Sequence, residues 1–313
     1  MPGSDDAAAA DFDDCLGRWS EVGFDYGVVE EITTRTGIGV GGLRRRHLDG
    51  REEVLNLYYR LAADHHGRGL GKEAARAWTA HALEWLPSLP VVATSREINE
   101  RSLRAALAAG LDPAETTDDA PPGEPASRVL RAPRVESPEW FDEQTRESVL
   151  DLWSAVNDTG GAVGFLPGAP RHEVAATLAV HEEGMADGGT TAVLLRAAGG
   201  RVVGLGFWVG DPNPLFAHTR TAYRIMTHPE MRGRNLGRLM MAAMHRVARE
   251  QGVEVVVLDV RSGLGTTRFY EGAGYVEVGR VPGVIRVAAS DDRDSVIMAR
   301  RLDGRPMVAD GRA

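Results

Sequence analysis

The chain has little of what marks secreted, zinc-binding or membrane proteins. Cys15 is the only cysteine in 313 residues, which excludes a disulfide framework and a cysteine-based zinc site and favours a reducing compartment. No apolar run reaches the roughly 18 residues of a membrane helix, and the acidic first residues lack the basic and apolar stretches of a signal peptide. We therefore expect a cytoplasmic protein without a membrane partner.

Lysine is almost absent, and acidic residues outnumber basic ones by 45 to 36. Lys72 is the only lysine, and the formal net charge at pH 7 is −9. Such a chain repels nucleic acids, so none is expected as a partner, whereas cationic amines are favoured. The histidine pairs His65–His66 and His172/His181 have no cysteine or carboxylate at ligand spacing. They are therefore interpreted as surface residues, and no metal site is predicted.

The length and composition favour two domains. Hydrophobic residues make up 43% of the chain and charged residues 26%, which is enough for each half to bury a core. Residues 116–128 are rich in proline, aspartate and small residues and show no periodicity, as expected of a linker. The prediction is a first domain at 1–115, a linker at 116–128, a second domain at 129–303 and a tail at 304–313.

Hydrophobic periodicity predicts the same series of elements on both sides of this segment. A hairpin, a third strand, a helix, a strand and a short helix come before it. After it, the strand "RVLRAPRV" and two helices precede a similar series that ends in two closing strands. The motifs "GRGLG", ending at Gly71, and "GRNLG", ending at Gly237, lie 166 positions apart, and Gly110 and Gly274 follow them by 39 and 37 positions. This matched spacing indicates an internal duplication.

The segment "MRGRNLGRLMM" has the properties of an anion site. A strand that runs into a glycine-rich turn and then a helix presents unpaired N–H groups and a positive dipole end, which suit a pyrophosphate. Arg232, Arg234 and Arg238 add positive charge there. In the first half, Lys72 follows Gly71 without the spacing of a nucleoside-triphosphate loop, so that function is disfavoured.

These turns resemble the signature Arg/Gln-x-x-Gly-x-Gly/Ala of the GNAT superfamily of acetyl-CoA-dependent N-acetyltransferases. "RGRNLG" supplies Arg232 and Gly237 but has Asn235 at the first motif glycine. "HGRGLG" supplies both glycines but has His66 in place of Arg/Gln. Since asparagine tolerates positive φ, Asn235 is expected to preserve the turn.

A second element, "RFYEGAGY", resembles the part of the family in which a tyrosine lies beside the CoA sulfur. Tyr270 is the matching residue, and a phenol with a pKa near roughly 10 stays protonated at neutral pH, so it can donate to a departing thiolate. The resemblance implies direct transfer of the acetyl group to an amine. It also implies an α/β fold of two domains, each with a mixed, mostly antiparallel sheet flanked by helices and a splayed central pair of parallel strands.

The resemblance also implies two sets of residues around the cofactor. In the second half, the acetyl-CoA contacts would be Ile225, Met226, Thr227, Arg232, Gly233, Arg234, Asn235, Leu236, Gly237, Arg238, Phe269 and Tyr270. In the first half, "NERSLRAALAAGL" resembles the Asn-x-x-Ser element of ribosomal-protein-type members. A second CoA site there would use Leu61, His66, Gly67, Arg68, Gly69, Leu70, Gly71, Lys72, Asn99 and Ser102.

The general base is left open by the sequence. A lysine-like acceptor amine must lose a proton, at a cost of roughly 4–5 kcal/mol at pH 7. The central strand "TRTAYRIMT" carries no carboxylate. His218 and His228 flank it and Asp259 lies near the end of the next strand, so these residues and a relay through water are the alternatives.

Only the second half has enough chain before its hairpin for the strand and two helices that form the acceptor groove in the family. We therefore expect the second domain to catalyse and the first to be truncated, with little sequence for closing strands. The aromatic residues Trp140, Trp153, Phe165 and Trp208 line an acceptor pocket or pack in the core. The predicted activity is acetylation of a small-molecule primary amine by a monomer or homodimer; the alternatives are a non-catalytic acyl-CoA-binding protein and a protein N-acetyltransferase.

Overall fold

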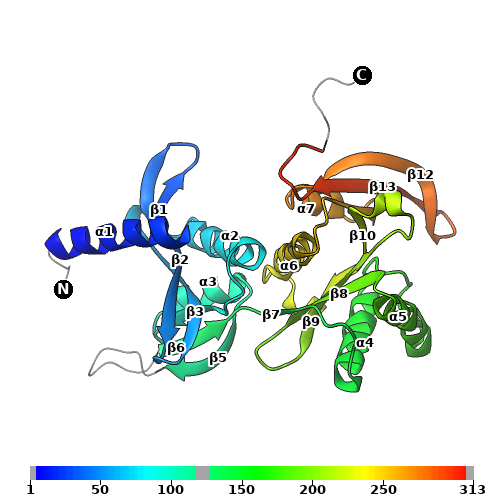
Figure 1. The fold of residues 1–313 in the computed structure, drawn as a ribbon, viewed down its shortest axis with the longest axis horizontal. Coiled ribbons are helices and arrows are strands. Elements are labelled where there is room, and N and C mark those ends of the chain that lie inside the picture. Colours follow the sequence, from blue (N-terminus) through cyan, green and yellow to red (C-terminus); the bar gives the residue numbers. More distant parts are fainter. Residues whose placement is uncertain (1–4, 118–126, 308–313) are drawn as a thin grey trace. The chain divides into compact units, whose positions relative to one another are not determined.

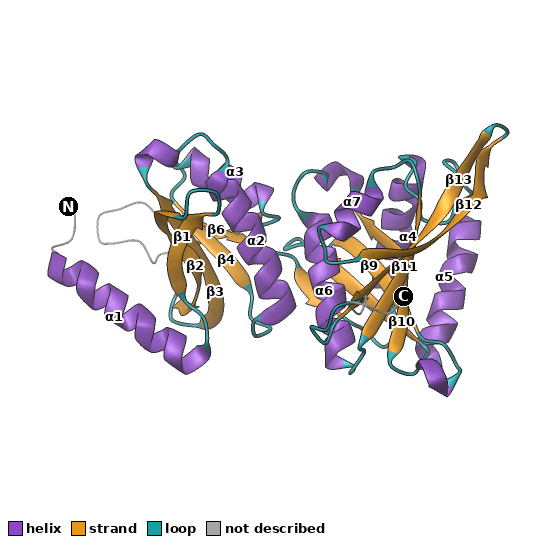
Figure 2. Cartoon of the chain, turned by 90° about the horizontal axis from the view of Figure 1, so that it is seen from above, coloured by secondary structure: helices purple, strands orange, loops and turns teal. Residues whose placement is uncertain are grey.

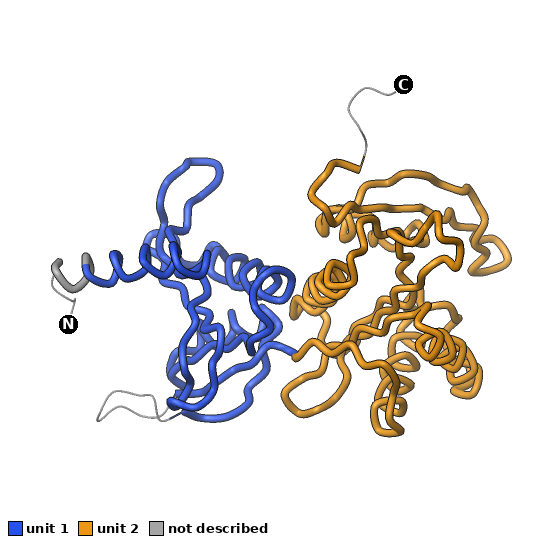
Figure 3. Tube along the Cα trace, in the orientation of Figure 1, with its two compact units in different colours: residues 1–133 blue, residues 134–313 orange. Residues whose placement is uncertain are grey.

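The computed structural model describes residues 5–117 and 127–307, and the chain divides into two compact units, residues 1–133 and 134–313 (Figure 3). Within the described residues the first unit holds a six-stranded sheet and the second a seven-stranded sheet. Both are mixed sheets flanked by helices (Figure 1). The predicted α/β class with two domains is confirmed.

The second unit has eleven helices and strands of regular structure among its described residues. They are β7 (Arg134–Glu136), α4 (Glu143–Asp158), α5 (Arg171–Ala186), β8 (Thr190–Arg196), β9 (Val202–Val209), β10 (Thr219–Thr227), α6 (Leu236–Glu250), β11 (Val255–Arg261), α7 (Thr266–Glu271), β12 (Val276–Ala288) and β13 (Asp291–Arg301). The strand order is β12-β13-β11-β10-β9-β8-β7, and β10 and β11 are its parallel neighbours.

The first unit repeats this layout without the first strand and with one helix before its hairpin where the second unit has two. Its elements are α1 (Asp5–Val22), β1 (Tyr26–Glu31), β2 (Thr36–Leu48), β3 (Glu52–Leu61), α2 (Leu70–Trp85), β4 (Val91–Ser95), α3 (Glu100–Ala108), β5 (Asp112–Thr117) and β6 (Ser127–Arg131). From its other edge, the second sheet has the order β7-β8-β9-β10-β11-β13-β12. Without β7, its strands correspond one by one to the order β1-β2-β3-β4-β6-β5 of the first sheet. The topology therefore confirms the internal duplication.

Helices cover both faces of the second sheet because successive side chains of its strands point in opposite directions. On β9, a Cβ at Gly204 or Gly206 would meet methionine side chains of α6, whereas Leu205 and Phe207 lie in a core shared with α4 and α5. Figure 2 shows α6 and α5 on opposite sides of the strands. The strands thus separate an α6 face from an α4/α5 face.

The predicted division of the chain differs from the structure at residues 116–131. Thr116 and Thr117 belong to β5, and β6 pairs with β5 and β4, so both strands close the first sheet. The linker prediction otherwise falls on residues 118–126, which lie outside the described residues. The expectation of little sequence for closing strands was wrong, because "RVLRAPRV" is two strands: β6 ends before Pro133, which has no N–H to donate, and β7 begins after it.

Candidate functional site

The parallel pair β10 and β11 opens toward its carboxyl ends. The two strands pair only over Thr219–Thr221 and Val255–Val257, so the later residues of β10 have β9 as a neighbour on one side and no ladder to β11 on the other. β10 then leads into the glycine turn and α6, while β11 leads into α7. Because the carboxyl ends of parallel strands share an edge of the sheet, the turn and α7 meet at this opening.

A β-bulge lies within the open part of β10. The register against β9 shifts between Tyr223 and Met226, and Arg224 adopts φ +55°. Such a bulge leaves extra backbone unpaired and redirects side chains, and it is common beside active sites. The equivalent strand β3 pairs with β2 over Gly39–Leu48 and Glu52–Leu61 without a register shift. The two units therefore differ at the centre of the opening.

The glycine turn has the conformation that the sequence predicted. Gly233 has φ +79° and Asn235 has φ +66°, matching Gly67 at +78° and Gly69 at +82° in the first unit. The prediction that Asn235 preserves the turn is confirmed. A Cβ at Gly237 would lie 3.2 Å from the Phe269 ring, so a side chain at this position would require the ring to shift away from α6.

The charges around the two turns differ. The first turn of α6 contains no acidic residue, and Arg232 contacts Thr159 through one 3.2 Å hydrogen bond. In the first unit, Glu73 lies in the first turn of α2, and Arg68 forms an ion pair with Glu31. Since negative charge near a helix N-terminus opposes anion binding, the second turn suits a phosphate better than the first.

Tyr270 on α7 lies beside this turn. Its ring packs at 5.1 Å from Phe269 and 5.8 Å from Tyr275, measured between centroids. Burial raises the pKa of the Tyr270 phenol to about 12. No residue in the described ranges bonds to its hydroxyl, so this group can serve a ligand. Tyr275, by contrast, is buried and bonds through its hydroxyl to His245 of α6.

The three candidate bases lie at different places. His218 precedes β10 at the end where β10 and β11 are paired, six positions before the bulge, so the structure separates it from Tyr270 and contradicts that assignment. Asp259 lies on β11 two positions past the last residue paired with β10 and accepts a 3.3 Å hydrogen bond from Ser295. His228 follows β10 at the open end, and burial lowers its pKa.

The α4/α5 face at the bulge contains residues that the sequence did not single out for this site. His181 of α5 stacks on Phe207 with 4.2 Å between ring centroids, and lies 6.4 Å from Tyr223. Burial, together with the charge of Arg224, lowers its pKa to about 4. The expectation of a surface histidine was wrong for His181, because strands and helices distant in sequence enclose it.

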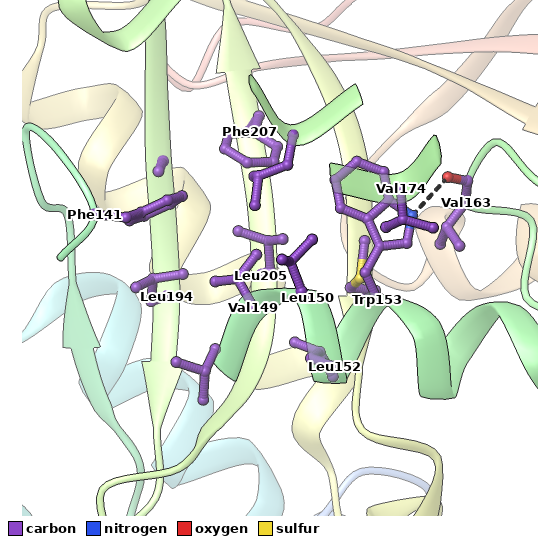
Figure 4. Packing of buried hydrophobic residues seen from close by; sticks show 14 of the residues in the cluster. Phe141, Val149, Leu150, Leu152, Trp153, Val163, Val174, Leu194, Leu205 and Phe207 are labelled. Atoms are coloured by element: carbon purple, nitrogen blue, oxygen red, sulfur yellow. Dashed lines mark hydrogen bonds between the residues drawn. The ribbon is translucent and has the colours of Figure 1, made fainter. Parts of the chain in front are cut away.

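The predicted aromatic residues separate into different environments. Trp153 is fully buried and donates to the carbonyl of Val163, which ties the loop after α4 to that helix (Figure 4). Phe165 packs against it at 6.1 Å. Trp208 lies on the α6 face and donates to Met244, and Trp140 is 71% exposed. Trp153 and Phe165 thus lie on the α4/α5 face.

The first unit contains a cavity of about 460 Å³ in the opening between β3 and β4. It is lined by residues that include Leu57, Tyr59, Ser95, Asn99 and Ser102. Asn99 and Ser102 line this cavity, and the Asn99 side chain also caps α3 by accepting from the Ser102 N–H. This cavity favours a ligand site in the first unit, whereas the bulge and the positive charge favour the second.

Sequence comparison assigns both units to one family. Models described as "Acetyltransferase (GNAT) domain" match residues 1–112 and 187–277. No curated protein matches the sequence of the chain.

Several solved structures are similar over about half of the chain. They include the ribosomal-protein-alanine N-acetyltransferase from Brucella melitensis (17% identity, 53% of this chain and 98% of that one, TM-score 0.44), a GNAT-family acetyltransferase from Streptococcus pneumoniae (14%, 54% and 99%, 0.44) and the spermidine/spermine N-acetyltransferase from Vibrio cholerae (13%, 54% and 92%, 0.41). From the two domain matches and the duplicated topology, the chain belongs to the GNAT acetyltransferase family and carries two of its domains in tandem.

Proposed function

We propose that the second unit transfers an acetyl group from acetyl-CoA to the primary amine of a small molecule. The observation that carries this proposal is the bulged strand β10, which leads into an arginine-rich turn that packs against α7, the helix of Tyr270. The first unit has the opening without the bulge, and its turn is partly neutralised by Glu31 and Glu73. We assign it a structural role.

Each group in the second unit has a distinct task in this proposal. Backbone N–H groups at the start of α6, with Arg232 and Arg238, bind the pyrophosphate of acetyl-CoA. The backbone of Ile225–Thr227, which has no ladder to β11, orients the acetyl thioester, which acetyl-CoA supplies as the activated group. Tyr270 donates its proton to the sulfur as the C–S bond breaks, and its raised pKa keeps it protonated. Asp259, His228 or a water between them accepts the amine proton.

Calorimetric titration of acetyl-CoA into the full chain tests the site assignment. We expect one site per chain. Arg232→Ala/Gly237→Ala should abolish binding, and His66→Ala/Gly71→Ala, which changes the equivalent positions of the first unit, should leave it unchanged. Circular dichroism should show that both variants are folded. Two sites, or loss of binding only in the first-unit variant, would refute the assignment to the second unit.

Release of free CoA thiol tests the reaction itself. With a panel of primary amines, thiol release should depend on the added amine and should yield the N-acetyl product by mass spectrometry. Binding of acetyl-CoA without amine-dependent release from any panel member would favour a non-catalytic acyl-CoA-binding protein instead. Absence of acetyl-CoA binding would refute both.

A further inference from the structure

Arg224 is an unusual residue at the centre of β10. It is the bulge residue, and its φ of +55° lies in the left-handed region that arginine seldom adopts. Strain of this kind persists only where the surrounding structure imposes it, and it is concentrated at ligand sites. The fold therefore holds the Arg224 side chain on the α4/α5 face although the backbone at this residue is strained.

The surroundings of the Arg224 guanidinium are apolar and closely packed. Its central carbon lies 5.6 Å from the centroid of the Trp153 ring. A Cβ at Gly164 would lie 2.0 Å from Nη1, so the loop after α4 passes directly over the group. Trp153 and Asn157 hold this loop by donating to the carbonyls of Val163 and Leu166. The guanidinium is thus fixed between α4, its following loop and the bulge.

No acceptor among the described residues compensates the charge of Arg224. The Arg224 Nε is shielded from solvent and forms no hydrogen bond, and in residues 5–117 and 127–307 no carboxylate forms an ion pair with the group. Burial lowers its pKa, and Tyr223 is the other group that perturbs it. His181, whose pKa is lowered to about 4 by burial and by the charge of Arg224, is neutral at neutral pH. Arg224 is half-buried, and its Nε is shielded from solvent without a hydrogen bond, which is costly for a cation. Its retention therefore points to an anionic ligand at the guanidinium.

We infer that Arg224 binds a carboxylate of the acceptor, so that the substrates are amines that also carry a carboxylate, such as amino acids. This inference rests on the proposed function of the second unit. The planar guanidinium matches a carboxylate through two parallel hydrogen bonds. A single cation among aromatic rings balances one negative charge, which favours a carboxylate over a phosphate dianion. Arg224 directly precedes Ile225–Thr227, so the bound carboxylate lies beside the backbone that orients the thioester.

The test compares amino acids with their α-carboxamides as acceptors. Each pair differs only in the carboxylate, and the amide holds more free amine at a given pH because no adjacent negative charge stabilises its ammonium form. Without carboxylate recognition, the amides should therefore react at least as fast. We expect kcat/KM of the wild type to favour one or more of the acids by roughly 10- to 100-fold, the range of a hydrogen bond to a charged group.

Two variants and a matched control assign the preference to Arg224. Arg224→Gln should lose the preference through a higher KM for the acid, so that acid and amide react with similar kcat/KM. Arg224→Lys should recover part of it, because it keeps the charge without the paired donors. Arg220→Gln removes an equal charge from the paired end of the same strand, where Arg220 bonds only to backbone carbonyls, and should keep the preference. Equal rates for acids and amides, or a preference that survives Arg224→Gln, would overturn the inference.

A binding measurement keeps the inference testable if no amine is acetylated. Thermal unfolding of the full chain, with the same acids and amides at millimolar concentration, should show stabilisation by acids in the wild type and not in Arg224→Gln. Stabilisation of this kind without thiol release would support the carboxylate site and count against acetyl transfer. If acids and amides shift the wild-type unfolding temperature equally, or neither does, Arg224 does not recognise a carboxylate.

Discussion

At the scale of single residues, Tyr270 combines a hydroxyl that no described residue binds with a pKa raised to about 12 by burial. Tyr270→Phe should lower kcat by roughly 10²- to 10⁴-fold, the usual contribution of a general acid, and leave acetyl-CoA affinity nearly unchanged. The phenol stays protonated far above neutral pH. If kcat of the wild type falls as the pH rises toward 10, the same fall should therefore be seen in the variant. Steady-state kinetics across pH, with calorimetry for affinity, checks this; an unchanged kcat would remove Tyr270 from the mechanism.

His181 should make the second unit sensitive to acid. Burial and then the charge of Arg224 lower its pKa in the folded chain to about 4, whereas the unfolded side chain titrates near roughly 6.5. Between these values the unfolded chain binds the extra proton, so the free energy of unfolding falls as the pH is lowered. We expect the wild type to lose up to about 2 kcal/mol more than His181→Leu between pH 7 and pH 4, once partial exposure of the ring is allowed for. Urea unfolding at both pH values measures the difference, and equal losses would show that the ring is not desolvated as described.

The sequence predicts residues whose role depends on local conformation, and it misses residues whose role depends on neighbours distant in the chain. Asn235 was predictable because a glycine-rich turn before a helix needs positive φ at that position. Arg224 was not, since its partnerless state follows from the loop around Gly164, some 60 positions earlier in the chain. An arginine in the middle of the apolar strand "TAYRIMT" was the one available signal.

At the scale of elements, Asp25 joins α1 to the first sheet. Its side chain is fully buried and bonds to Arg18 of α1, to Arg44 of β2 at 2.7 Å and to the backbone of Tyr26. Asp25→Ala leaves two guanidiniums without their shared acceptor and should destabilise the first unit by about 3 kcal/mol. Asp25→Asn keeps the shape without the charge and should lose less.

Limited proteolysis within α1 and chemical denaturation check this prediction together. Cleavage between Arg18 and the start of β1 should be faster in Asp25→Ala than in the wild type, and Asp14→Ala is the control because Asp14 is mostly exposed and contacts Arg18 from within the helix. Equal cleavage of Asp25→Ala and the control would show that α1 docks by other contacts.

The sequence predicts whether a segment is a helix or a strand more readily than it predicts the sheet that a strand joins. Periodicity gives the strands and helices because it records which face of each is buried. It does not tell which sheet a strand joins, and β6 illustrates this: its backbone bonds to β4 and β5 through pairs such as Ala93–Leu130, which local pattern does not record. The proline-rich segment before it therefore resembled a linker although both flanking strands belong to one sheet.

At the scale of the whole molecule, the described residues include no helix long and apolar enough to cross a membrane. Each unit completes its own sheet, since the ladders run within residues 26–131 and within residues 134–301. The second unit also contains the bulge, the turn around Asn235, Tyr270 and Arg224. Everything that the proposed reaction requires of the protein therefore lies after residue 133.

A chain of residues 134–313 should consequently fold and bind acetyl-CoA by itself. Its core around Trp153 and Phe207 is buried by α4, α5 and the central strands of the same unit, so removal of residues 1–133 takes away none of the side chains of that core. We expect cooperative thermal unfolding, one acetyl-CoA site with an affinity within about threefold of the full chain, and the same acid-to-amide preference.

The separate first unit, residues 1–133, should bind acetyl-CoA at least roughly 100-fold more weakly, because Glu73 and the Arg68–Glu31 pair offset the positive charge of its turn. Calorimetry on both pieces decides the matter: comparable affinities would assign a working cofactor site to the first unit and refute a purely structural role for it.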